Sequence, residues 1–161
     1  EHASVTDSSA MNLLVDAGVT VVTQPNLIAE RGDQYLLDVK AADHSFLYRC
    51  RGFLHAGVPL GGGTDAPYGK PDPWAAMRAA VTRTTVGGRI IGAQESLTPE
   101  QSLALFTTPS GNPGGSPRKI AVGEPADLCL LDCPWSIARS SLTNDHVAAT
   151  VVDGLPIYQR P

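Results

Sequence analysis

The stretch Ala56-Gly57-Val58-Pro59-Leu60-Gly61-Gly62-Gly63-Thr64-Asp65 contains the pattern that decides the fold class. Gly57 stands where a helix would end, and a short apolar strand follows it and runs through three glycines to a carboxylate. A similar joint, Asp16-Ala17-Gly18-Val19, begins the β-branched run at residues 19–23. Repeated helix–Gly–strand joints are typical of βα units packed around a parallel sheet. The sequence therefore predicts an α/β fold.

Helices are predicted before, between and after these strands, over residues 7–18, 46–56 and 74–85, and from residue 98 to about residue 107. Asp72 and Pro73 suit the N-cap and first position of the third helix. Thr98 and Gln101 have the spacing of a capping box at the start of the fourth. Residues 27–45 mix charged and apolar side chains and predict a long connection, of the kind that is usually functional or mobile.

The last third of the chain has a different pattern. Residues 109–119 hold too many Gly and Pro residues for regular structure. Short strands are predicted at residues 126–132, 146–152 and 156–159, with a hairpin turn at Asp153-Gly154. Consecutive strands joined by tight turns are antiparallel, so this part predicts a small sheet separate from the parallel one.

Charge and hydropathy exclude two classes of partner. The 161 residues include 12 Lys and Arg against 16 Asp and Glu, which gives a formal net charge of −4. Such a chain has no general attraction for nucleic-acid phosphates or anionic membranes. Its apolar runs are far shorter than the roughly 20 residues of a membrane span. We therefore expect neither a nucleic-acid nor a membrane partner.

The cysteines indicate a reducing compartment. Cys50, Cys129 and Cys133 are odd in number and form no Cys-x-x-Cys pair. Free cysteine usually behaves as a small buried apolar residue, and structural disulfides are rare in the cytosol. We expect three reduced thiols and a cytoplasmic protein.

Two residues stand where chemistry is commonly found. Asp65 follows a buried strand, the position at which barrel and open-sheet enzymes hold their active-site residues, although a turn Asp bonded to its own backbone is the alternative. A single histidine such as His2 is more often structural than a metal ligand. His44, His55 and His146 have no partner at metal-ligand spacing in the sequence. Spacing alone therefore predicts no metal site.

Several pieces of the chain, in this order and spacing, resemble the C-terminal part of the amidohydrolase superfamily, specifically the amidohydrolase-3 group of metal-dependent hydrolases. The pieces are Glu1-His2-Ala3, residues 18–25, residues 56–67, Leu97-Thr98-Pro99-Glu100-Gln101 and residues 122–128. The resemblance covers nearly the whole chain. It implies the C-terminal portion of a (β/α)8 TIM-type barrel for residues 1–112, followed by strands of a small β-sandwich for residues 113–161.

The resemblance also implies the site residues. His2, after barrel strand six, is expected to be a metal ligand. Asp65, after strand eight, is expected to bind the metal and to act as the catalytic base that takes a proton from the attacking water. Gln24, after strand seven, matches the family's Gln-Pro turn and is expected to line the substrate pocket. The cofactor implied is a divalent metal, zinc being the one expected, and the reaction is hydrolysis of C–N bonds in amides or cyclic amides.

The family's other metal ligands have no counterpart in this sequence. We therefore expect a fragment that binds metal weakly and is inactive by itself, because a catalytic zinc usually keeps three protein ligands. A small-molecule substrate is expected, together with homo-oligomerisation or association with the missing N-terminal half. The alternative is a non-catalytic α/β fragment stabilised by self-association or by that half.

Overall fold

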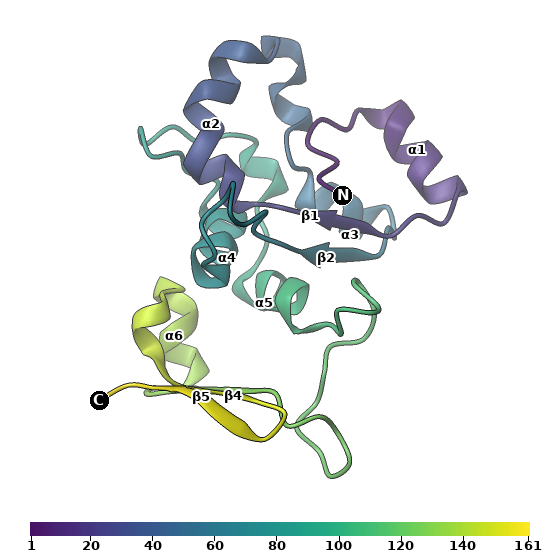
Figure 1. Cartoon of the computed structure of the whole chain (residues 1–161). Coiled ribbons are helices and arrows are strands. Elements are labelled where there is room, and N and C mark those ends of the chain that lie inside the picture. The colour runs from purple at the N-terminus through teal and green to yellow at the C-terminus, as the bar shows by residue number, and fades with distance from the viewer.

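The computed structural model describes residues 1–161 and contains two separate sheets (Figure 1). The first is a parallel pair of strands, β1 (Val21–Thr23) and β2 (Leu60–Gly62), in which Val21 faces Leu60. The second is antiparallel in the order β3-β4-β5 and consists of β3 (Leu128–Leu131), β4 (Val147–Val152) and β5 (Leu155–Gln159). The predicted α/β class is confirmed at this level.

The chain has six α-helices: α1 (Ser8–Asp16), α2 (Asn26–Asp38), α3 (Cys50–His55), α4 (Pro73–Thr82), α5 (Pro99–Thr107) and α6 (Trp135–Ser141). Three short 3-10 turns are η1 (Ala41–Phe46), η2 (Ala93–Glu95) and η3 (Asn144–His146). The predicted caps are confirmed. Asp72 accepts hydrogen bonds from two amides of the first turn of α4, and Thr98 and Gln101 form both bonds of a capping box on α5.

The prediction of a long connection at residues 27–45 was wrong, because α2 and η1 occupy that segment. Gly32 interrupts the helical pattern in the sequence, but its lack of a side chain lets α2 pack closely against Thr85 and Ile91. A Cβ at this position would lie 2.6 Å from Cγ2 of Thr85 and 2.8 Å from Cδ1 of Ile91. The helix predicted at residues 46–56 is also shorter, since only α3 forms there, and α6 was not predicted.

The main hydrophobic core lies beneath β1 and β2. It joins residues from the two strands, from α1, α3, α4 and α5, and from the loops beside them: Met11, Val21, Cys50, Phe53, Val58, Leu60, Ala80, Leu97 and Leu105. A smaller cluster connects α4 to the antiparallel sheet through Trp74, Met77, Leu142 and Val147. In Figure 1, α5 lies between the parallel pair and the antiparallel sheet. None of the helices has both the length and the apolar composition needed to cross a lipid bilayer.

Asp33 fastens α2 to the loop that follows α4. Its carboxylate accepts hydrogen bonds from Oγ1 of Thr85 at 2.8 Å, from the amide of Gly87 at 2.7 Å and from Nε of Arg89 at 2.9 Å. The bond from Thr85, followed by those from Arg89 and Gly87, lowers the pKa of Asp33 below its ordinary value of 3.8. The folded state therefore favours the charged carboxylate.

We predict that the stabilisation from Asp33 is lost in acid. A carboxyl group whose pKa is depressed by folding stabilises the protein above its unfolded pKa, and this contribution disappears as the pH falls through the folded pKa. Asp33→Asn should lower the free energy of unfolding at neutral pH, by a difference that shrinks once the pH drops below 3.8. Urea titrations across that range measure it. Asp16→Asn, a carboxylate of α1 with no hydrogen-bond partner in the structure, is the control, and a gap unchanged in acid would contradict the prediction.

Candidate metal centre

Three segments meet at the carboxyl end of the parallel pair. β2 lies along one edge of β1, where the amide of Val21 donates to the carbonyl of Pro59. Residues 1–3 lie along the other edge, because the amide of His2 donates to the carbonyl of Val22 at 2.8 Å, and Oγ1 of Thr23 donates to the carbonyl of His2 at 3.0 Å. β1 therefore separates the segment that carries His2 from the strand that leads to Asp65.

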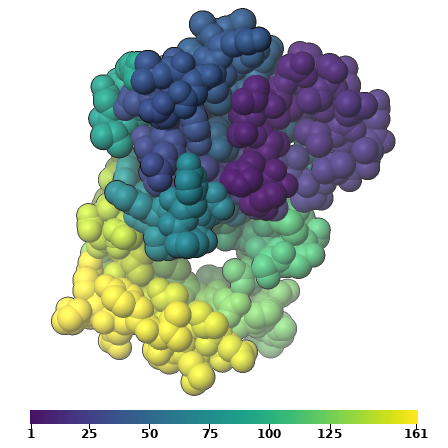
Figure 2. All heavy atoms as spheres, turned by 45° about the horizontal axis from the view of Figure 1, so that its top comes forward, coloured from purple at the N-terminus to yellow at the C-terminus, as the bar shows by residue number.

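The structure brings the side chains of His2 and Asp65 together. Nε2 of His2 lies 3.8 Å from Oδ2 of Asp65, and these side chains are 40% and 33% exposed. In Figure 2 the purple N-terminal residues lie beside the teal residues that follow β2. The largest cavity, of about 810 Å³, lies elsewhere, between α4, α5 and the antiparallel sheet. Because both side chains of the His2–Asp65 pair are partly exposed, small molecules can reach them directly from solvent.

Both halves of this pair are held in an uncommon backbone conformation. φ is +63° at His2, +50° at Ala3 and +58° at Asp65, which is the left-handed region. Residues other than glycine seldom adopt it, and such residues concentrate at active sites and ligand-binding loops when the surrounding structure holds them there. The backbone at the ends of the strands thus supports a functional assignment for these two side chains.

Gln24 and Asn26 are buried amides between the two halves. Nε2 of Gln24 donates to the carboxylate of Glu1, and its Oε1 has no hydrogen-bond partner. Nδ2 of Asn26 donates to the carbonyl of Thr64 at 3.0 Å, and its Oδ1 is also without a partner. Asn26 therefore fixes the turn that presents Asp65. Asn26 was not predicted as a site residue, although it directly follows Gln24-Pro25 at the end of β1, where it begins α2.

Two stacked tyrosines, both uncharged, lie close to this end of the sheet. The rings of Tyr35 and Tyr48 are stacked with centroids 6.0 Å apart, and their hydroxyls lie 3.5 Å apart. Burial raises the pKa of both phenols, that of Tyr48 far above its usual range, and the nearby charge of Asp65 adds to the effect. Both hydroxyls therefore stay protonated at neutral pH. Nothing in the sequence pattern had singled out these tyrosines.

The donors at the strand ends fit a divalent metal in type and in spacing. Imidazole nitrogen and carboxylate oxygen are both common zinc ligands, and ligand atoms of one tetrahedral zinc lie roughly 3.4 Å apart. The 3.8 Å between Nε2 of His2 and Oδ2 of Asp65 is slightly wider, and small rotations of these half-exposed side chains would close the difference. His44 is different, since its Nε2 is bonded to the carbonyl of Val39 at 2.9 Å.

Comparisons with known proteins bear on the same assignment. The chain is 28% identical, over 99% of its length, to the N-substituted formamide deformylase of Arthrobacter pascens, and it spans 30% of that protein. It also resembles the crystal structures of uncharacterized metal-dependent hydrolases from two Pyrococcus species. For P. horikoshii the TM-score is 0.58 at 24% identity, over 66% of this chain and 22% of the other. For P. furiosus the values are 0.55 and 26%, over 66% and 21%.

A family model, described as the amidohydrolase family, matches residues 1–158. The match covers all six helices and both sheets except Gln159, the last residue of β5, and it includes His2, Gln24 and Asp65. The chain belongs to the amidohydrolase family.

Proposed function

We propose that this chain contributes His2 and Asp65 to the metal centre of a hydrolase that cleaves C–N bonds in amides or cyclic amides, with zinc as the ion. The observation that carries the proposal is the 3.8 Å approach of these two side chains from opposite sides of β1. Membership of the amidohydrolase family supports the reaction class.

The residues divide the work between them. A divalent metal held by His2 and Asp65 would lower the pKa of a bound water and so supply hydroxide at neutral pH. Asp65 accepts the proton of the attacking water and passes it to the departing amine, as a general base and then a general acid. Gln24 is assigned to the substrate pocket; its side chain is fully buried and Oε1 has no partner within the protein, so this role requires the side chain to become accessible when substrate binds.

The substrate that we propose to test first is an N-substituted formamide. The relative from Arthrobacter pascens is named as a deformylase for this class of amide. The half-exposed pair admits a small molecule directly from solvent. Hydrolysis would release formate and an amine, both of which are simple to quantify.

We further propose the wider setting of these residues. Residues 1–112, with the parallel pair, would form the C-terminal βα units of a (β/α)8 barrel, and residues 113–161, with the antiparallel sheet, a portion of a β-sandwich. The three cysteines form no disulfide, which fits a cytoplasmic protein. Two protein ligands are fewer than the three usual for a catalytic zinc, so we expect the 161-residue chain alone to bind metal weakly and to turn over no substrate.

Metal binding at the strand ends is tested with Mn²⁺, a paramagnetic ion that prefers oxygen and nitrogen donors to thiolates. We expect Mn²⁺ to broaden the amide NMR signals of Gly63 and Thr64 in the wild-type chain. Asp65→Asn should weaken the effect by at least about tenfold, because the amide that replaces the carboxylate carries no charge. Asp16→Asn is the matched control. Equal broadening in the wild type and in Asp65→Asn would contradict the assignment.

The activity requires a longer polypeptide. We propose a hybrid in which this chain replaces the matched region of the Arthrobacter deformylase, assayed for formate release in the presence of zinc. Asp65→Asn should reduce kcat by about 10²–10⁴, the range of a lost general acid–base group. A folded, zinc-bound hybrid that loses nothing on this substitution would rule out the catalytic role.

The second candidate is a non-catalytic α/β chain that is stabilised by self-association. Two observations favour it. β1 and β2 pair only with each other and with short segments, and apolar side chains of α1 and α2 lie at the surface, Leu13 being 67% exposed and Leu37 74% exposed. Sedimentation velocity and the Mn²⁺ titration together separate the two candidates. Under this second one the chain is a stable oligomer, and Mn²⁺ broadens the signals of Gly63 and Thr64 equally in the wild type and in Asp65→Asn.

A further inference from the structure

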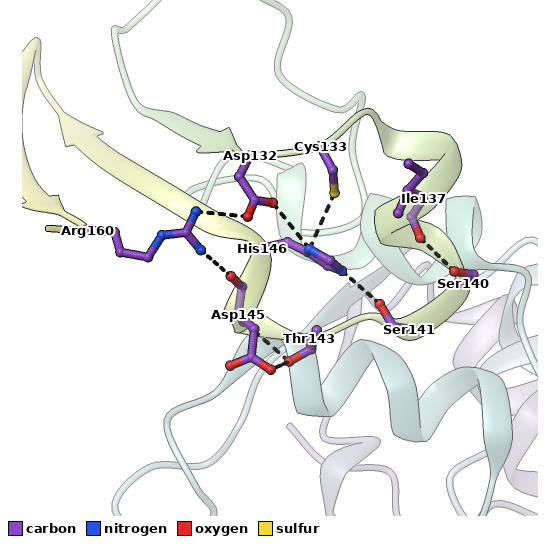
Figure 3. Close-up of polar contacts among 9 residues, drawn as sticks. All are labelled: Asp132, Cys133, Ile137, Ser140, Ser141, Thr143, Asp145, His146 and Arg160. Carbon is purple, nitrogen blue, oxygen red and sulfur yellow. Dashed lines mark hydrogen bonds and ion pairs between the residues drawn. The ribbon is translucent and has the colours of Figure 1, made fainter.

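A second group of metal-ligating side chains lies beside the antiparallel sheet. It is far along the chain from His2 and Asp65, the strand-end pair. Asp132 and Cys133 follow β3, and His146 is the last residue of η3, just before β4. Nδ1 of His146 lies 3.4 Å from Sγ of Cys133 and 3.3 Å from Oδ1 of Asp132. The three ligand atoms all lie within 4.8 Å of one another. Figure 3 shows the three side chains pointing toward a common point.

Neighbouring groups hold two of these side chains in a ligating orientation. Nε2 of His146 lies 3.0 Å from Oγ of Ser141, and an Nε2–H bond to this hydroxyl leaves the lone pair of Nδ1 facing Cys133 and Asp132. Nη2 of Arg160 donates to Oδ2 of Asp132 at 2.8 Å, which leaves Oδ1 for the common point. Both contacts are visible in Figure 3. These hydrogen bonds use Nε2 of His146 and Oδ2 of Asp132, and they leave Nδ1 and Oδ1 available to a metal ion.

We propose that Asp132, Cys133 and His146 form a zinc site of their own, separate from the pair at the strand ends. Thiolate, imidazole and carboxylate are the three side-chain ligand types of protein zinc, and a thiolate disfavours magnesium and calcium. Ligand atoms around one tetrahedral zinc lie roughly 3.4–3.6 Å apart. The separations from Nδ1 of His146 to the other two ligand atoms, 3.4 Å and 3.3 Å, are close to this spacing, and all three ligand atoms lie within 4.8 Å of one another.

The position of the site defines its role. Zinc here would link the corner after β3 to the turn that begins β4, two segments already joined by the bond from the amide of Asp132 to the carbonyl of His146 at 2.9 Å. The side chains of His146 and Asp132 are 23% and 36% exposed, so an ion and one coordinating water have access from solvent. The proposed zinc site is therefore structural: it would stabilise the antiparallel sheet and take no part in the hydrolysis proposed above.

Cobalt is the probe for this site, because Co²⁺ replaces zinc in tetrahedral positions and shows a near-ultraviolet charge-transfer band only when a thiolate is bound. We expect the reduced 161-residue chain to develop this band, to saturate at one equivalent and to lose it when zinc is added. Cys133→Ser should abolish the band, and His146→Gln should weaken Co²⁺ binding by at least about tenfold. Cys129→Ser, an exposed thiol of β3, and His2→Gln should both retain it.

Absence of the band from the wild-type chain overturns the proposal, as does a band that survives in Cys133→Ser or disappears in Cys129→Ser. Circular dichroism shows whether each variant is folded. If Cys133→Ser does not fold, the wild-type chain itself provides the test through the rate at which a thiol reagent modifies Cys133. Zinc should slow that rate at least about tenfold and leave the rate at Cys129 unchanged. Equal modification of Cys133 with and without zinc overturns the proposal.

Discussion

Arg83→Met is expected to lower the free energy of unfolding by about 3–5 kcal/mol, because it removes the donor of three buried hydrogen bonds to backbone carbonyls. The guanidinium of Arg83 is fully buried at the end of α4. It donates to the carbonyls of Ile91 at 3.0 Å, of Tyr48 at 2.9 Å and of Leu47 at 2.7 Å. Methionine fills the space of the aliphatic stem but leaves three buried carbonyls without donors, and each such acceptor costs about 1–3 kcal/mol.

The loss extends to the strand-end pair. The amide of Tyr48 donates to the carbonyl of Ser4 at 2.9 Å, so the loop that Arg83 holds in turn holds the segment after His2. Urea unfolding measures the stability, and Mn²⁺ broadening at Gly63 measures the metal affinity. Arg51→Met, an exposed arginine in α3, is the matched control and should lie within about 0.5 kcal/mol of the wild type. A similarly small effect at Arg83 would refute the prediction.

Gly69→Ala is expected to destabilise the chain by about 2–4 kcal/mol and to displace Asp65. A Cβ on Gly69 would overlap the carbonyl oxygen of Thr64 and lie 2.6 Å from Nδ2 of Asn26. Because one of these atoms belongs to the backbone, the loop itself must move, and the bond between Asn26 and Thr64 breaks. A lost buried hydrogen bond and an overpacked contact each cost about 1–3 kcal/mol.

The comparison that isolates this effect is Gly111→Ala. Gly111 has nothing within 4 Å of its ideal Cβ position, and its φ is not positive. We expect Gly111→Ala to be close to neutral in urea unfolding, and Gly69→Ala to lose both stability and the Mn²⁺ effect at Thr64. If Gly69→Ala retains wild-type broadening and stability, the turn at Thr64 does not position Asp65.

Local signals in the sequence predicted the elements that depend on local interactions. Asp72 with Pro73, and Thr98 with Gln101, mark helix starts because their bonds close within a few residues. α2 was missed because its helical pattern is diluted by charges and by Gly32, whose reason is a tertiary contact with Thr85 and Ile91. α6 follows Pro134 without a side-chain cap and gave no comparable signal.

The candidate sites divide in the same way. The approach of His2 to Asp65 was expected from a family resemblance, since nothing local in the sequence links residues on opposite sides of β1. The group at Asp132, Cys133 and His146 could not be predicted from spacing, because the β3–α6–η3 path determines which residues meet. Asn26 and Arg83 became visible as contributors only through the carbonyls that they hold, those of Thr64 and of Leu47, Tyr48 and Ile91.

The two arms of the strand-end pair are anchored unequally. Asp65 follows β2, which is paired with β1 over its whole length. The backbone of His2 is held to β1 by only two hydrogen bonds, one from its amide to the carbonyl of Val22 and one from the hydroxyl of Thr23 to its carbonyl. Local opening is easiest where the fewest bonds must break together. The side chain on the less tightly anchored segment has the greater freedom to adjust, so in the proposed site the imidazole of His2, more than the carboxylate of Asp65, would move to close the 3.8 Å between them.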